Sequence, residues 1–120
     1  MRSIRETSLR TSAALALVLS AGTASAGPVL WGYGVKTCAQ FLDAAPGNSA
    51  PASIAGDEFL RYREWLAGLV SGLNLASGSD VLGGAQLDAA VAKIHARCKD
   101  EPNQDFFNAS IEVIKTLSRH

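Results

Sequence analysis

The sequence predicts a small all-α protein, a compact bundle of about four helices stapled by one disulfide. Apolar side chains recur at the three- and four-residue spacing of a helix face in several segments, and no segment alternates in the manner of a strand. Clusters of Pro and Gly separate these segments. The two cysteines, Cys38 and Cys98, fall on two different predicted helices.

The first 26 residues have the layout of a secretory signal peptide. Three arginines precede the apolar stretch 13–21, and the small residues 24–26 follow it. This stretch is about ten residues long, whereas a membrane-spanning helix needs roughly 20, so a retained anchor is disfavoured. We therefore expect export to the periplasm, cleavage after Ala26 and a single mature domain over residues 27–120.

The charge of the mature chain argues against two classes of partner. Removal of the signal peptide leaves eight Lys or Arg residues and ten Asp or Glu residues, a net charge of about −2. Proteins that grip nucleic acid or an anionic membrane surface carry a basic patch or stripe. We expect neither partner here.

The two cysteines predict a disulfide. A domain of this size buries only about 60 to 65% of its unfolded surface, and an exported protein often gains stability from a disulfide. A metal site would need further ligands, yet His95 and His120 are the only histidines and no paired-ligand spacing is present. A disulfide between Cys38 and Cys98 closes a loop of about 60 residues and should stabilise the fold by roughly 4 kcal/mol.

Breakers and caps divide the mature chain into four expected helices. The segment 37–40 (TCAQ) matches a capping box, and Pro102 follows two acids, a combination typical of a helix start. Residues 27–35 predict an irregular arm, whose Trp31 and Tyr33 we expect to pack onto the helices. The expected helices span residues 37–45, 57–77, 85–98 and about 102–118, with a loop over 46–56.

The longest expected helix carries almost no charge after Glu64, which predicts burial on every side. Its small residues would let another helix approach closely. Asn74 would then be an internal polar side chain that needs hydrogen-bond partners. The side that we expect a neighbouring helix to cover consists of Gly68, Ser71, Gly72 and Leu75.

No motif in the chain indicates catalysis, a cofactor or a metal. There is no Gly-x-Ser-x-Gly elbow, no phosphate-binding Gly-rich loop and no cluster of metal ligands. His95 has no acid or nucleophile near it in the sequence, and we expect it to be a surface or partly packed residue. The sequence therefore predicts a protein that is not an enzyme.

Three segments, in this order, resemble the periplasmic acid-stress chaperones HdeA and HdeB. They are 37–42 (TCAQFL), 65–74 (WLAGLVSGLN) and 97–102 (RCKDEP), the last followed by Phe106. The resemblance covers most of the chain from Lys36 to about Leu117. It implies a small helical fold with its two cysteines bridged.

The resemblance also implies a function. Such a protein is a folded homodimer near neutral pH and exposes apolar surface in acid to bind unfolding periplasmic proteins. The stretch from Trp65 to Leu75 is the expected apolar surface in this chain. The candidate client or dimer residues are Trp65, Leu66, Leu69, Val70 and Leu73.

Two other functions fit the same pattern. The chain is similar in outline to small helical, disulfide-bonded periplasmic immunity proteins that block a secreted cell-wall amidase. Those proteins tend to use more than two cysteines. A relative of the chaperones with a changed role is the third possibility, and a neighbouring toxin gene would favour the immunity function.

Overall fold

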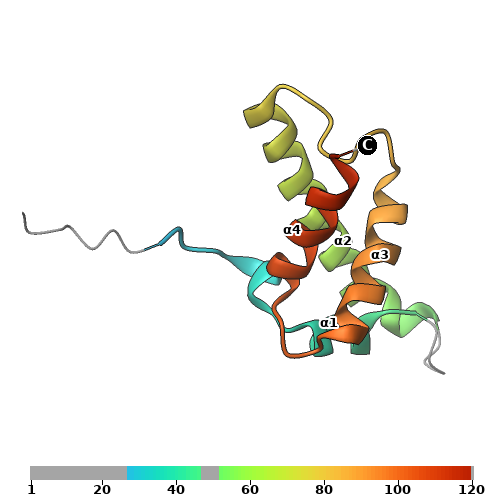
Figure 1. Ribbon diagram of the computed structural model, residues 1–120. Coiled ribbons are helices and arrows are strands. Elements are labelled where there is room, and N and C mark those ends of the chain that lie inside the picture. Colours follow the sequence, from blue (N-terminus) through green and yellow to red (C-terminus); the bar gives the residue numbers. More distant parts are fainter. Residues whose placement is uncertain (1–26, 47–51, 120) are drawn as a thin grey trace, which may run out of the picture.

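The computed structural model describes residues 27–46 and 52–119, and within them it confirms a four-helix, all-α fold (Figure 1). The predicted signal peptide lies outside these residues. Among the described residues there is no strand, and one isolated antiparallel bridge joins Thr37 to Asp105. The elements are the 3-10 turn η1 (Gly32–Val35) and the helices α1 (Cys38–Ala44), α2 (Ala52–Ser77), α3 (Leu87–Asp100) and α4 (Phe106–Leu117).

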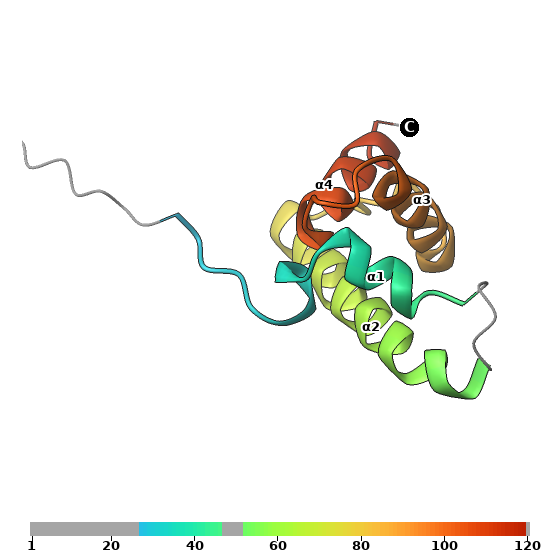
Figure 2. The same cartoon turned by 90° about the horizontal axis from the view of Figure 1, so that it is seen from below.

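The helices form two layers with the short elements between them. Helices α3 and α4 pair with each other, and α2 lies on the opposite side of the molecule (Figure 2). Helix α1 contacts α2, α3 and α4, while η1 contacts α2 and α4. The core therefore lies around α1, where aromatic rings from three helices meet: Phe41, Tyr62 and Phe106 are all fully buried.

The starts of α1 and α4 are fastened together. The predicted capping box is present: the Thr37 hydroxyl accepts from the backbone of Gln40, and the Gln40 side chain accepts from the backbone of Thr37. Asp105 caps α4 by accepting from the backbone of Asn108 at 2.7 Å. Backbone bonds link the two starts, from Cys38 to the carbonyl of Gln104 and from Phe106 to that of Lys36.

The predicted disulfide is present and joins α1 to α3. Both Cys38 and Cys98 are fully buried, and their Cα atoms lie 4.9 Å apart. Such a bridge is typical of proteins in oxidising compartments. Each cysteine sits on the inward face of its helix, as the apolar spacing predicts.

Two predicted helix boundaries are wrong. Helix α2 starts at Ala52, five residues before the expected start, because Gly56 does not interrupt it and Pro51 directly precedes its first residue. Helix α4 starts at Phe106, four residues after Pro102, because Asp105 supplies the cap and the intervening residues form a turn.

The prediction that α2 is buried on every side is also wrong. Its inward face carries Tyr62, Leu66 and Val70, which lie in the core. On its outward face Gly68, Ser71, Gly72 and Leu75 are exposed, and no helix of the described chain covers them. The lack of charge on that face therefore marks an apolar surface and not a buried one.

The Asn74 side chain finds a partner in the loop after α2, since its oxygen accepts from the backbone of Val81 at 2.8 Å.

Candidate functional site

The five residues expected to become exposed in acid as a client or dimer surface lie in the core or pack against it in this structure. Leu66 is fully buried and Val70 is 7% exposed, so both belong to the core. Trp65, Leu69 and Leu73 are partly buried and pack against that core. The apolar spacing predicts the face of α2 that packs into the core, and exposure of that face in acid stays a prediction.

An irregular arm, residues 27–31, approaches α2 beside Trp65. The Trp65 indole donates from Nε1 to the Trp31 carbonyl at 3.0 Å. The same ring covers Gly34, where a Cβ atom on the backbone would lie 2.1 Å from the ring carbon Cζ2. Only a glycine lets the backbone pass this close to the indole. The arm is therefore held to α2 at Trp31, and η1, which follows the arm, is held to it at Gly34.

The Glu58 carboxylate on α2 bonds to Tyr33 and Lys36, which follow the arm in the chain. The Tyr33 hydroxyl donates to Glu58 at 3.1 Å, and the Lys36 ammonium lies 3.4 Å from the other Glu58 oxygen. Lys36 also stands over the Tyr33 ring. Burial, followed by the Glu58 charge, raises the pKa of the neighbouring Tyr62 to about 12. Tyr62 therefore stays neutral at physiological pH and acts as a core aromatic residue.

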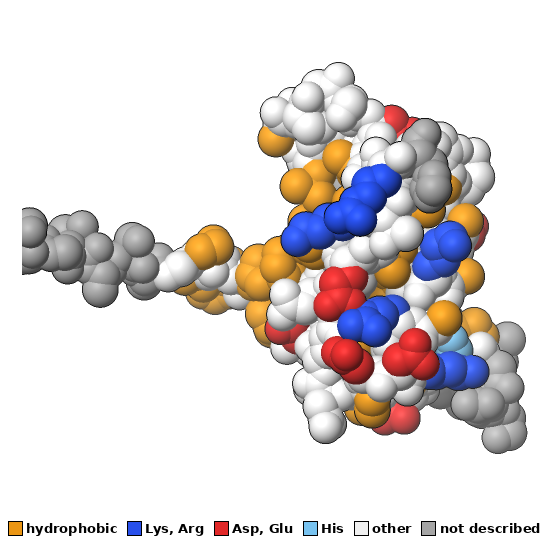
Figure 3. All heavy atoms as spheres, viewed as in Figure 1, with side chains coloured by type: hydrophobic (Ala, Val, Ile, Leu, Met, Phe, Trp, Pro, Cys, Tyr) orange, Lys and Arg blue, Asp and Glu red, His pale blue; other side chains and the backbone are white. Residues whose placement is uncertain are grey.

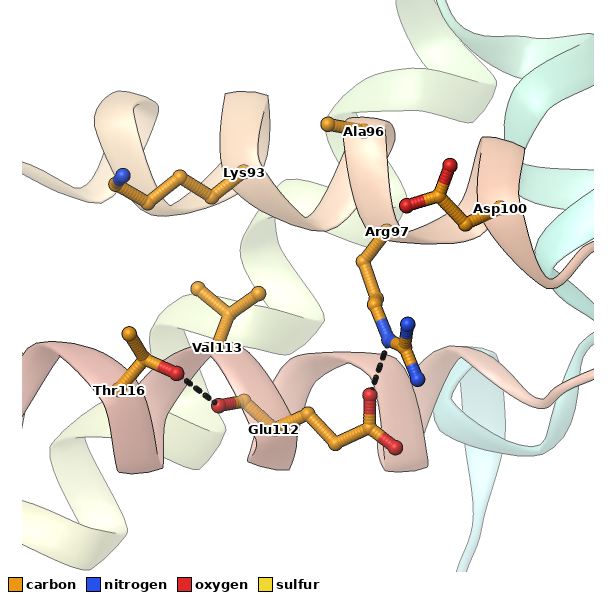
Figure 4. Close-up of a pocket in the computed structure, with 7 residues that line it drawn as sticks. All are labelled: Lys93, Ala96, Arg97, Asp100, Glu112, Val113 and Thr116. Carbon is orange, nitrogen blue, oxygen red and sulfur yellow. Dashed lines mark hydrogen bonds and ion pairs between the residues drawn. The ribbon is translucent and has the colours of Figure 1, made fainter.

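One hollow on the surface lies between α3 and α4 and holds about 460 Å³ (Figure 4). Arg97 crosses it from α3 to pair with Glu112 on α4, and it also pairs with Glu101 at 3.2 Å. The hydrogen bond from Arg97 is the main reason that the pKa of Glu112 lies below its ordinary value. These charges are satisfied by one another, so the hollow is best explained as a structural contact between helices.

A second hollow, of about 400 Å³, lies where α1 ends against α2 and α3. His95 lines it beside Phe59 and Val91, and its ring meets Phe41 edge-on. Burial, with a smaller contribution from Lys99, lowers the pKa of His95. The imidazole is partly packed, as expected from the sequence, and no nucleophile or carboxylate bonds to it in the described chain.

The third hollow, again about 400 Å³, lies between the arm and α2 and joins a larger apolar surface. Two large apolar side chains that line it are exposed, Trp31 at 80% and Val29 at 69%, and two more are exposed elsewhere along α2, Leu75 at 87% and Leu60 at 50%. Hydrophobic side chains gather where the arm meets the body and along the upper part of α2 (Figure 3). We call this the arm–α2 surface; it consists of Val29, Trp31, Leu60, Gly68, Ser71, Gly72 and Leu75.

Sequence reasoning finds only part of the arm–α2 surface. The helical spacing correctly groups Gly68, Ser71, Gly72 and Leu75 on one side of the helix, but it predicts a neighbouring helix above them. Trp31 is expected to pack, yet only its carbonyl is bonded and its ring is exposed. The available signal is the absence of charge on α2 next to an apolar arm.

The described residues present an exposed apolar surface and no metal-binding cluster. Within residues 27–46 and 52–119, no group of His, Cys, Asp or Glu side chains could hold a metal ion. In the same residues no helix is both long enough and apolar enough to cross a bilayer. Exposed apolar patches of this extent typically mark sites of protein contact.

No family model, no curated protein and no solved structure matches the chain.

Proposed function

We propose that this protein is exported to the periplasm and there binds apolar segments of other proteins while they unfold in acid. The observation that carries the proposal is the arm–α2 surface, which presents large apolar side chains on a body held by a buried disulfide. A protein that holds unfolding chains needs apolar contact area that is available to many partners. The resemblance to HdeA and HdeB supports the same function.

Acid would extend this surface without taking the molecule apart. Protonation of ten carboxylates and two histidines moves the mature chain from about −2 toward about +10, and self-repulsion at that charge opposes compact packing. The Cys38–Cys98 bond is covalent and does not depend on pH in this range. Helices α1 and α3 would therefore stay joined while contacts around α2 loosen.

The test is an aggregation assay with the protein expressed from its full sequence and purified from a periplasmic extract. At about pH 2 to 3, where carboxylates are protonated, we expect it to suppress light scattering by an acid-unfolded periplasmic enzyme. At pH 7, with the same enzyme unfolded by heat, we expect weaker suppression. A protein that suppresses no aggregation at low pH would contradict the proposal.

A matched pair of variants connects the assay to the surface. Trp31→Ala removes an exposed ring whose backbone bond to Trp65 remains, so we expect the fold to persist and suppression to fall severalfold. Lys99→Ala removes an exposed side chain on α3, away from the surface, and should suppress aggregation as the unaltered protein does. If both variants suppressed aggregation equally well, clients would not bind at the arm–α2 surface.

One observation favours a second function, a specific protein binder such as an immunity protein. Trp31 is exposed, yet its backbone is fixed by the bond to Trp65, and fixed aromatic anchors are common at the centre of specific interfaces. This function predicts one tight partner, encoded beside this gene, that binds at neutral pH. A nanomolar affinity for a neighbouring amidase, lost in Trp31→Ala, would favour it over the chaperone.

A further inference from the structure

The hollow beside His95 has the size and the lining of a small-molecule site. It holds about 400 Å³ where α1 ends against α2 and α3. Ligand sites in proteins are typically clefts of about 300 to 1,000 Å³ with apolar walls and a few polar groups that orient the ligand. The apolar residues that line this hollow are Ala45, Pro46, Phe59, Val91 and Ala92.

Two polar side chains, Asp88 and His95, line the same hollow from α3. They are seven residues apart, which places them on one side of the helix and about 10 Å apart along its axis. The Asp88 carboxylate is paired with Arg63 of α2 at 2.8 Å, so its charge is offset within the protein. The described residues form no hydrogen bond with the His95 ring, so its nitrogens can bond a ligand.

The His95 end of the hollow is the positive end. Lys99 follows His95 by four residues on α3, so the two side chains lie on the same side of the helix. Burial lowers the pKa of His95, and the charge of Lys99 lowers it further. The other elements at the hollow contribute Ala45 and Pro46 after α1 and Phe59 from α2, none of which titrates. An anion at this end would therefore meet an ammonium and an imidazole.

We infer that this hollow binds an apolar monocarboxylate of the size of a medium-chain fatty acid. Its carboxylate would lie at His95 and Lys99, since hydrogen bonds from these cationic donors to a carboxylate are strong. Its hydrocarbon chain would lie along α3 toward Asp88, where burial among apolar side chains removes it from water. The inference goes beyond the proposed function and does not depend on it, because the arm–α2 surface consists of other residues.

Calorimetric titration with octanoate at pH 6 tests the inference on the protein purified after expression of its full sequence. We expect one site with a dissociation constant on the order of 0.1 to 1 mM, which is ordinary for a ligand of about ten non-hydrogen atoms. Octanol lacks the charge and octylammonium reverses it, so both should bind about tenfold more weakly. Octanol that binds equally well, or octylammonium that binds more tightly, would overturn the inference.

The pH dependence provides a readout specific to His95. A bound carboxylate favours the charged imidazole, so octanoate should raise the pKa of His95. The proton NMR signal of the ring, identified by its loss in His95→Gln, should then titrate at a higher pH when octanoate is present. By the same linkage the affinity should increase severalfold from pH 8 to pH 6 in the unaltered protein and change little in His95→Gln.

Two matched pairs of variants locate the site. Lys99→Ala should weaken octanoate binding about tenfold, whereas Lys93→Ala removes the same charge beside the hollow between α3 and α4 and should leave it unchanged. Ala92→Leu fills the hollow from an exposed position and should abolish binding, whereas Ala96→Leu adds the same side chain outside it and should not. Helical circular dichroism should be the same for all four variants. Full binding by both Lys99→Ala and Ala92→Leu, or no binding of octanoate at millimolar concentration, would overturn the inference.

Discussion

At the scale of single residues, Gly34 sets how closely the arm can approach α2. The Trp65 ring occupies the space that any Cβ at this position would need, with three ring atoms within 2.8 Å of it. The ring also donates to the Trp31 carbonyl and meets Phe106 at 5.7 Å. A side chain at position 34 must therefore displace either the indole or the arm.

A pair of glycine substitutions measures this contact. Gly34→Ala should lower the free energy of unfolding by about 2 kcal/mol, because overpacking a tight contact forces its neighbours to shift. Gly68→Ala meets open space on the exposed face of α2 and should raise the stability by about 0.5 to 1 kcal/mol through helix propensity. Urea denaturation followed by tryptophan fluorescence gives both values, and two effects of the same sign would contradict this account.

Glu112 makes stability depend on pH through its bond to Arg97. Its pKa is lowered in the folded protein, so the stabilisation is complete above the ordinary carboxyl pKa and is lost as the pH falls through the folded value. Glu112→Gln should therefore unfold at lower urea than the unaltered protein at pH 7, with the difference shrinking toward zero in acid. Glu64→Gln alters an exposed carboxylate that lies 3.5 Å from Arg63 and should change little at either pH.

At the scale of elements, the capped starts of α1 and α4 are bonded to each other. Thr37 and Asp105 are each the cap of one helix, and the isolated bridge joins these same two residues. The capping box of α1 is visible in the sequence because its two partners are three residues apart. The cap of α4 is not, since Pro102 offers an earlier start and the pairing with Thr37 is not local.

Substitution of Asp105, the N-cap of α4, should lower the free energy of unfolding by a measurable amount. Asp105→Ala removes the acceptor for the backbone and side-chain nitrogens of Asn108, which should lower the free energy of unfolding by about 1 kcal/mol. Asp105→Asn keeps an acceptor oxygen and should recover most of that loss. Thermal and urea unfolding of the two variants give the comparison, and an Asn variant as unstable as the Ala variant would show that the oxygen is not what matters.

At the scale of the whole molecule, the disulfide joins α1, which lies between the two layers, to α3. Cys38 begins α1 and Cys98 lies near the end of α3, with 60 residues of separation in the chain. The segment between them contains all of α2, which contacts η1 and α1 more extensively than the α3–α4 pair. The bridge therefore closes a chain loop that contains α2, whose outward residues Gly68, Ser71, Gly72 and Leu75 are exposed.

Reduction of the bridge should destabilise the fold by about 4 kcal/mol, the cost expected for opening a loop of this length. Urea unfolding with and without a reductant measures the difference. A Cys38→Ser, Cys98→Ser double variant should behave as the reduced protein does. Mass spectrometry of the non-reduced protein should find the peptides of Cys38 and Cys98 linked, and free thiols would contradict the structure.

The sequence by itself determined the helical class, the number of helices, the cap of α1 and the inward direction of both cysteines. The helices, the cap and the inward direction of the cysteines follow from the spacing of residues a few positions apart. The pairing of the cysteines follows because the chain has only two. Only the tertiary structure decided which face of α2 meets the core. The apolar residues of α2 point both inward and outward, and the two sets differ in surroundings and not in composition.

The same limit applies to the functional surface. The apolar arm and the uncharged half of α2 are visible in the sequence, but their proximity depends on the Gly34–Trp65 and Tyr33–Glu58 contacts, each of which spans more than twenty residues of chain. The sequence predicts burial on every side of α2, which holds for Leu66 and Val70 but not for Leu75, and it predicts Trp31 against the helices although the ring is exposed. Local periodicity identifies an apolar face, and only long-range packing decides whether the protein itself or another molecule can cover it.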